Sequence, residues 1–338
     1  MPFHSSKINK FLVIGLVVFS SCKKEDKNTS ETINVELTPY EVTYPDYFPV
    51  MTIPEDNPLT AEGINLGRKL YYDPILSSTG YSCSSCHNNS ESFSSYSANS
   101  LPHVNLAWNT YFLWKGKISG ALEDIMMFEV EEFFQTDISK LNQSEDYQKE
   151  FKKVYNVDVI SSKEVAYALA QFFRTLTSSN SKFDQYLKKE LALTPSEMNG
   201  FQLFFTEKGD CFHCHSLGLF TDNSFHNIGL DSVFNGMNWG RYDVSGNKSD
   251  IGLYKTPTLR NVELTPPYMH DGRFETLEEV VEHYNSGVLP SATLDPIMTK
   301  AGKENGLMLS PTEKKDLVAF LKTLTDQTFI NNPQLSKP

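Results

Sequence analysis

The chain has 338 residues, enough for about two domains that each bury a core. Its hydrophobic fraction of 39% excludes wholesale disorder, and its composition is not that of a fibrous or polytopic membrane protein. The formal net charge of -12 argues against binding of nucleic acid, which requires clustered Lys and Arg, and favours a cationic partner.

The first residues have the pattern of an export signal. Lys7 and Lys10 precede the apolar run Phe11 to Phe19, which is too short to span a bilayer and is followed by Ser-Ser-Cys22. This order is similar to a bacterial lipoprotein signal. We therefore expect residues 1–21 to be removed and Cys22 to anchor the protein by lipid on the periplasmic side of a membrane. The alternative is an ordinary secretory signal with a chance cysteine.

The rest of the chain predicts a mainly α fold. Frequent prolines before residue 59 indicate that residues 22–58 form a tether and an extended lead-in on the surface. Few later segments alternate with period two. Helices are predicted at 61–72, 161–176, 194–205, 276–284 and 312–324, and N-terminal caps mark the starts of the helices at 161 and 194.

Two Cys-x-x-Cys-His motifs indicate covalent c-type haem. Thiols one turn apart reach the two vinyl groups, and the adjacent imidazole is delivered to the iron. A four-cysteine zinc site or two disulfides are the alternatives, but neither requires a His after each pair. The expected attachment and ligand residues are Cys83, Cys86, His87, Cys211, Cys214 and His215.

A weak internal repeat accompanies the two motifs: each follows a helix with a basic residue and a short polar loop. We therefore expect two cytochrome c-like haem domains packed together, at 59–190 and 191–330.

Longer stretches around both motifs resemble the bacterial di-haem cytochrome c peroxidase and MauG superfamily, over about residues 60–325. The matching segments include Leu66–Pro74, Asn99–Trp108, Trp114, Lys255–Asn261 and Pro267–Gly272. This resemblance implies that the first haem meets hydrogen peroxide and the second takes electrons from a small donor.

The resemblance also assigns roles to individual residues. His87 would be the proximal ligand of the peroxide-binding haem and His215 that of the electron-transfer haem. Trp114 would lie on the electron path between them, although a buried Trp is more commonly a core residue.

The family also holds a calcium ion between its domains. That site would fall to Asn99, Thr265 and Pro267, and oxygen ligands suit calcium. A capping Asn and a Pro-rich turn explain the same residues without metal.

The chain departs from the family around the first haem. The usual Trp-Asp-Gly-Arg becomes Trp114–Lys117, and the acid that moves a proton between the peroxide oxygens is hard to place. Glu131 or Glu132 could serve. His103 stands where the family has an apolar residue, and we expect a packed core His there rather than a ligand.

The sixth ligand of the second haem has two candidates. Met269 is the obvious one, because Met with His is a common c-type pair. We favour Tyr284, since the family's peroxidases have their ligating Met at that position and MauG has Tyr there. A phenolate favours ferric iron, so the second haem should have a low potential. A tyrosine that only packs at a helix end is the alternative.

The leading functional hypothesis is reduction of hydrogen peroxide with electrons from a small c-type cytochrome or copper protein. A MauG-like oxidase that withdraws electrons from a partner protein is the second, and the predicted Tyr284 ligand supports it. A non-catalytic di-haem electron-transfer lipoprotein is the third, which the lost family residues around the first haem support.

Overall fold

The structure is a computed structural model that describes residues 36–236, 238–304 and 306–338. The predicted signal and Cys22 lie outside these residues. Residues 37–338 form one compact unit, which is mainly helical, as predicted, with only four two-residue strands among its described residues. No described helix is long and apolar enough to cross a membrane.

The first half is built on a pair of helices, α1 (Ala61–Tyr72) and α5 (Ser162–Thr175). The side chains of Thr60 and Ser161 cap their N-termini, so the predicted starts of both helices are confirmed. The helices approach closely at Gly67, where an added Cβ would lie 1.9 Å from the Ala168 carbonyl oxygen. Only glycine permits this contact.

The second half repeats that pair with α7 (Pro195–Phe204) and α10 (Pro311–Lys322). An added Cβ on Gly200 would lie 1.9 Å from the Asp316 carbonyl oxygen. Gly67 and Gly200 therefore occupy equivalent positions, and so do Ala168 and Asp316. The sequence repeat is thus a structural repeat. Residues at equivalent positions of the two halves can therefore be compared.

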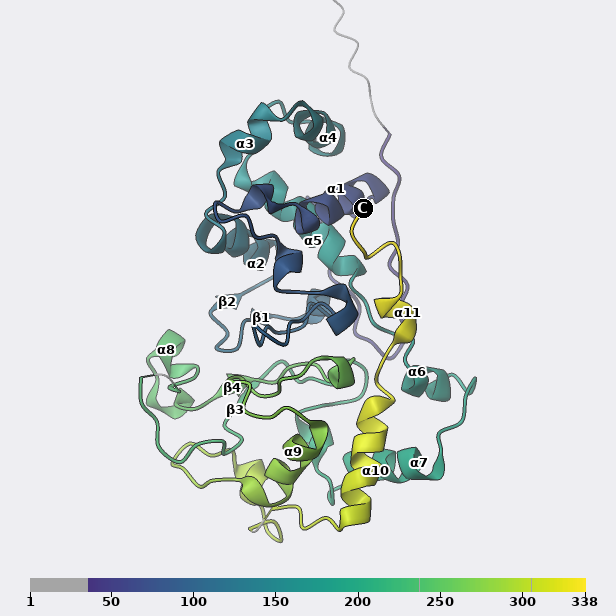
Figure 1. Cartoon of the computed structure of the whole chain (residues 1–338), viewed down its shortest axis with the longest axis vertical. Helices are drawn as coiled ribbons and strands as arrows, with labels where there is room; N and C mark the ends of the chain where they lie inside the picture. Colours follow the sequence, from purple (N-terminus) through teal and green to yellow (C-terminus); the bar gives the residue numbers. More distant parts are fainter. Residues whose placement is uncertain (1–35, 237, 305) are drawn as a thin grey trace, which may run out of the picture. The chain divides into compact units, whose positions relative to one another are not determined.

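The remaining elements complete the two halves, with α1 to α5 in the upper part of Figure 1 and α7 to α10 in the lower part. Two short antiparallel ladders, β1 with β2 and β3 with β4, lie near the level where the halves meet. The bounds are α2 Leu122–Phe128, α3 Ile138–Gln143, α4 Glu145–Tyr155, α6 Lys182–Leu187, α8 Tyr242–Ser245, α9 Leu277–Glu282, α11 Gln327–Ile330, β1 Tyr111–Phe112, β2 Ile118–Ser119, β3 Phe225–His226 and β4 Tyr254–Lys255.

In both halves a helix passes into a single π-helical turn. Helix α2 continues into Glu129–Phe133, and α9 continues into His283–Gly287. The predicted helix 276–284 therefore ends earlier, at Glu282. Such π-helical turns are frequent at functional sites.

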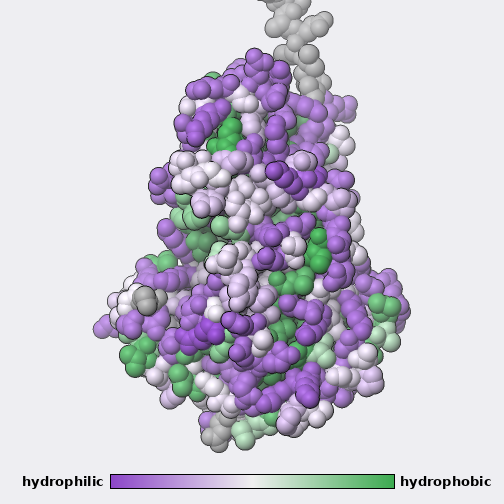
Figure 2. Space-filling view, in the orientation of Figure 1, coloured by the Kyte–Doolittle hydropathy of each residue, from purple (hydrophilic) through white to green (hydrophobic). Residues whose placement is uncertain are grey.

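The predicted lead-in before residue 59 contributes buried side chains to the protein. Phe48 and Met51 are buried in a small cluster with Trp108 of the first half and Leu219 of the second. The C-terminal segment also crosses over, because Phe329 belongs to the core of the first half (Figure 1). The face seen in Figure 2 is mostly hydrophilic, with apolar side chains in small patches.

Two candidate haem sites

The first Cys-x-x-Cys-His motif presents a neutral imidazole. The His87 Nδ1 lies 2.9 Å from the Phe93 carbonyl oxygen, which can only accept, so Nδ1 carries the proton. Burial lowers the pKa of His87 to about 4, which keeps the ring uncharged near neutral pH. The lone pair on Nε2 is therefore available to a metal.

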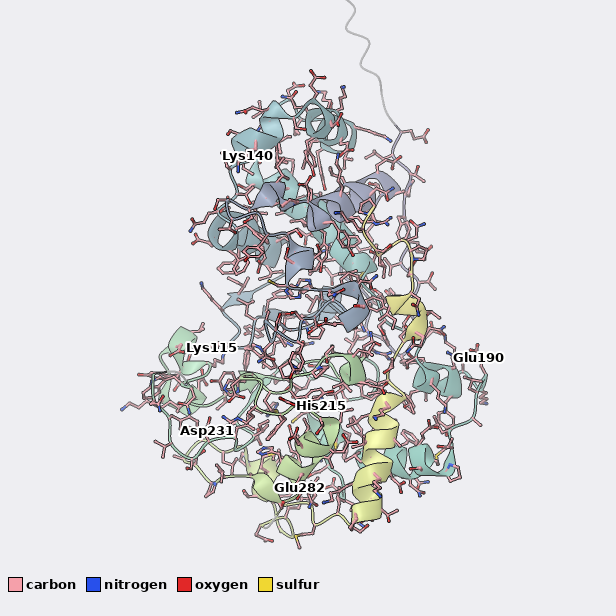
Figure 3. The ribbon with its side chains drawn as sticks, in the orientation of Figure 1. Lys115, Lys140, Glu190, His215, Asp231 and Glu282 are labelled. Atoms are coloured by element: carbon pink, nitrogen blue, oxygen red, sulfur yellow. The ribbon has the colours of Figure 1, made fainter. Side chains whose placement is uncertain are left out.

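The second motif has the same arrangement. His215 donates from Nδ1 to the Phe220 carbonyl oxygen over 2.8 Å, and burial lowers its pKa to about 4. Figure 3 shows His215 in the interior of the second half, close to α9. The same orienting bond in both halves is what two iron ligands of one kind require.

The surroundings of His215 fit a haem group. A cavity of about 240 Å³ is lined by Cys211, Cys214 and His215 together with mostly apolar side chains. Lys255 lines it with only 4% of its surface exposed and forms no ion pair with any described residue. Burial lowers its pKa to about 8.

Two further donors on the same cavity, the Trp114 Nε1 and the Tyr254 hydroxyl, are buried without a hydrogen-bond partner among the described residues. Buried polar groups normally have partners, and a buried ammonium favours an anion. An apolar macrocycle with anionic propionates would satisfy all three groups.

The alternatives for the cysteines find no support in the structure. Cys83, Cys86, Cys211 and Cys214 are all free thiols, so none forms a disulfide. Among the described residues, no metal-binding group joins cysteines of the two motifs, as a zinc site would need.

One candidate group contains Cys214, Asp222 and His226. However, Asp222 and Asp295 already bind both ring nitrogens of His226, at 2.8 and 2.5 Å. The hydrogen bond that His226 donates to Asp222 is the main reason that the pKa of His226 rises to about 11. His226 is thus a fixed cation beside the second site rather than a ligand.

The two candidates for the sixth ligand both line the second cavity. Tyr284 is partly buried near the sulfur atoms of Cys214 and Cys211, and desolvation raises its pKa. Met269 is partly buried as well, and its backbone has a φ of 70°. Exposure therefore does not separate the two residues, and Tyr284 stays the prediction that the family resemblance favours.

The structure does not place the predicted acids in the first site. Glu131 and Glu132 are exposed, whereas Glu129 of the same π-helical turn is mostly buried. Burial raises the pKa of Glu129 to about 7, and its carboxyl lies close enough to the Cys83 sulfur to raise the pKa of that thiol. The Glu129 carboxyl has no hydrogen-bond or ion-pair partner among the described residues, although the backbone of Glu129 is hydrogen-bonded. Exposure therefore favours Glu129 over the predicted Glu131 and Glu132 as the candidate acid of the first site.

The internal repeat explains why Glu129 faces the site. Glu129 follows the N-cap of α2, Ala121, by eight residues, and Tyr284 follows the N-cap of α9, Thr276, by eight residues. The first half thus has a carboxyl where the second has a phenol. Alignment of the two halves is the sequence signal that could have identified Glu129.

The residue predicted for the electron path and those predicted for calcium all line the second cavity. They are Trp114, Asn99, Thr265 and Pro267. The Asn99 side-chain nitrogen lies 3.3 Å from the Met269 carbonyl oxygen and donates to it. The loops of the two halves are therefore joined here by hydrogen bonds, and calcium stays a prediction.

Two candidate c-type haem sites in one chain, one beside a partly buried carboxyl and one beside a partly buried phenol, indicate a di-haem oxidoreductase. A family model described as di-haem cytochrome c peroxidase matches residues 61–192. Methylamine utilization protein MauG of Methylorubrum extorquens is 34% identical over 303 residues, which cover 83% of this chain and 84% of that protein. Cytochrome c551 peroxidase of Nitrosomonas europaea is 32% identical over 302 residues, which cover 82% and 84%.

A crystal structure of a MauG-like protein associated with microbial copper homeostasis superposes with a TM-score of 0.80 at 31% identity, covering 88% of this chain and 99% of that one. The chain belongs to the di-haem cytochrome c peroxidase and MauG superfamily. It is a peroxidase-type oxidoreductase, and the family implies two haem c groups.

Proposed function

We propose that the protein reduces hydrogen peroxide at the first site and takes the electrons from a small c-type cytochrome or copper protein through the second. The observation that carries the proposal is the difference between Glu129 and Tyr284 at equivalent positions of the two halves. A carboxyl with a pKa of about 7 can accept and release protons, whereas a tyrosine on the second cavity would bind the iron there and keep peroxide from it.

The haem at His87 would supply the iron at which the oxygen-oxygen bond is cleaved. Glu129 would accept a proton from the incoming peroxide and return it to the leaving oxygen, which departs as the first water. The other oxygen would become a second water by taking up two electrons from the donor protein and two protons. His87 would bind the iron through an imidazole that the hydrogen bond to Phe93 keeps oriented and that its lowered pKa keeps neutral. Trp114, which lines the second cavity, would carry electrons from there toward the first site.

A MauG-like oxidase that withdraws electrons from a partner protein is the second candidate, and the position of Tyr284 on the second cavity favours it. A phenolate ligand lowers the potential of a haem, so a mild donor would reduce it poorly. Turnover with a reduced small cytochrome separates the two functions. Peroxide consumption coupled to cytochrome oxidation supports the first, and peroxide reactivity without such turnover supports the second.

Glu129→Gln tests the proposed acid, with Glu131→Gln and Glu132→Gln as matched controls from the same turn. Loss of general acid-base catalysis typically costs 10²–10⁴-fold in rate. We expect a loss of about that size in the peroxide reaction of Glu129→Gln and near-normal rates in both controls. A loss confined to a control variant would return the role to that residue.

Location, partner charge and calcium are further parts of the proposal. Removal of residues 1–21 deletes two Lys and no acidic residue, so the mature chain would carry -12 - 2 = -14. Such a charge suits a basic donor protein that meets a Cys22-anchored enzyme at the periplasmic face of the membrane. A calcium ion at Asn99, Thr265 and Pro267 would join the loops of the two halves.

A further inference from the structure

The proposed proximal ligand of the first haem has a second imidazole packed against it. The rings of His103 and His87 stack with centroids 3.4 Å apart and planes 17° from parallel. The Phe173 ring also packs against His103, with ring centroids 4.7 Å apart. His103 is therefore in van der Waals contact with the ring that would bind iron.

Tyr71 fixes the orientation of both histidines. Its hydroxyl lies 3.2 Å from the His87 carbonyl oxygen and 3.2 Å from the His103 Nδ1. The carbonyl can only accept, so the Tyr71 hydroxyl donates to it and the His103 Nδ1 donates to the Tyr71 oxygen. Both imidazoles then carry their proton on Nδ1, with Nε2 unprotonated.

The second half lacks this arrangement at the equivalent positions. The His103 backbone N–H donates to the Phe93 carbonyl at 3.0 Å, and the Leu259 N–H donates to the corresponding Phe220 carbonyl at 3.3 Å. Leu259 thus stands where the first half has His103. The fold itself therefore does not require a histidine there.

Tyr71 has an apolar counterpart as well. Tyr71 follows Gly67 by four residues on α1, and Phe204 follows the equivalent Gly200 by four residues on α7. The hydrogen-bonded pair of Tyr71 and His103 is therefore a feature of the first site only, the site that would react with peroxide.

We propose that His103, oriented by Tyr71, is a positioning residue that fixes the plane of the His87 imidazole and stabilises the oxidised state of the first haem. The face of a neutral aromatic ring is electron-rich and attracts positive charge. An imidazole bound to iron becomes more positive as the iron is oxidised, so the stacked ring favours oxidation. This inference rests on haem binding at residues 83–87 and not on the peroxide reaction.

The test replaces His103 and Tyr71 by the residue types that stand at the equivalent positions of the second half. In the purified di-haem protein, His103→Leu should raise the reduction potential of the first haem and change its ferric electron paramagnetic resonance signal, while the second haem stays unchanged. Tyr71→Phe, which keeps the ring contacts and removes only the hydroxyl, should shift the first haem in the same direction by less.

A control is Leu259→Met, a volume-conserving change at the equivalent position of the second half, which should leave the first haem as it is. A first-haem potential and signal in His103→Leu equal to the unmodified protein would overturn the proposal. So would equal shifts of both haems, which indicate general loosening. If His103→Leu does not fold, Tyr71→Phe is the deciding variant. An unchanged first-haem potential in Tyr71→Phe would then refute the proposed role. No peroxide is used, so failure of the proposed function does not affect the result.

Discussion

Replacement of Glu129 by Gln should make the protein more stable at alkaline pH while it loses its reaction with peroxide. Burial raises the pKa of Glu129 from 4.5 to about 7. The difference, 7 - 4.5 = 2.5 pKa units, corresponds to about 3 kcal/mol at 1.36 kcal/mol per unit. The ionised side chain destabilises the folded protein by this free energy.

The sign follows from the raised pKa of the folded state. Below about pH 4.5 the carboxyl is neutral in both states, and there is no penalty. The penalty grows as the pH rises and is complete above about pH 7. Gln is neutral throughout and similar in size, so its advantage over Glu should increase by about 3 kcal/mol between these two limits.

Thermal unfolding of the haem-loaded protein at pH 4.5 and pH 8 measures this change. Glu129→Gln should melt several degrees higher relative to the unmodified protein at pH 8 than at pH 4.5. The exposed neighbour variant Glu131→Gln should show no such pH-dependent difference. An equal difference between Glu129→Gln and the unmodified protein at both pH values would refute the burial of an ionisable Glu129.

The remaining predictions concern the second site, the electron path and the anchor. Tyr284→Phe should leave the second haem high-spin or bound by a replacement, whereas Met269→Leu should leave its spectrum nearly unchanged; a ferric methionine-to-iron charge-transfer band lost in Met269→Leu would reverse the assignment. Trp114→Phe keeps most of the apolar volume, so the melting temperature should change little, but electron transfer between the haems should slow severely. Unaffected turnover would make Trp114 a core residue only. Cys22→Ser should move the protein from the membrane fraction to the soluble fraction, and unchanged membrane association would argue against the lipid anchor.

Features that depend on local sequence could be predicted well. Helix α1 has the predicted bounds, because the Thr60 cap and the Pro74 after its end are local signals. The two Cys-x-x-Cys-His motifs place their His residues in matching environments, since the orienting carbonyl comes only a few residues later in the chain.

Features that depend on tertiary packing could not be predicted. Glu129, Glu131 and Glu132 lie within four residues, and the π-helical turn changes which of them faces inward, so spacing alone cannot select the buried one. The contact of His103 with His87 joins residues on either side of a loop, and the sequence predicted a packed core histidine without its partner.

The buried Lys255 also has no local signal. Its ammonium donates to the Thr256 carbonyl but has no ion-pair partner among the described residues, and this becomes informative only when the second cavity is known. The comparison of the two halves residue by residue, rather than motif by motif, is what reveals Glu129 and His103 as differences between otherwise equivalent sites.

The most direct test of the account is a titration of the purified ferric protein with hydrogen peroxide, followed by optical and electron paramagnetic resonance spectra. The account predicts two covalent haems, of which the first changes its spectrum with about one equivalent of peroxide in the unmodified protein and reacts far more slowly in Glu129→Gln. A protein without covalent haem, or one whose two haems are both unchanged by excess peroxide, would contradict it.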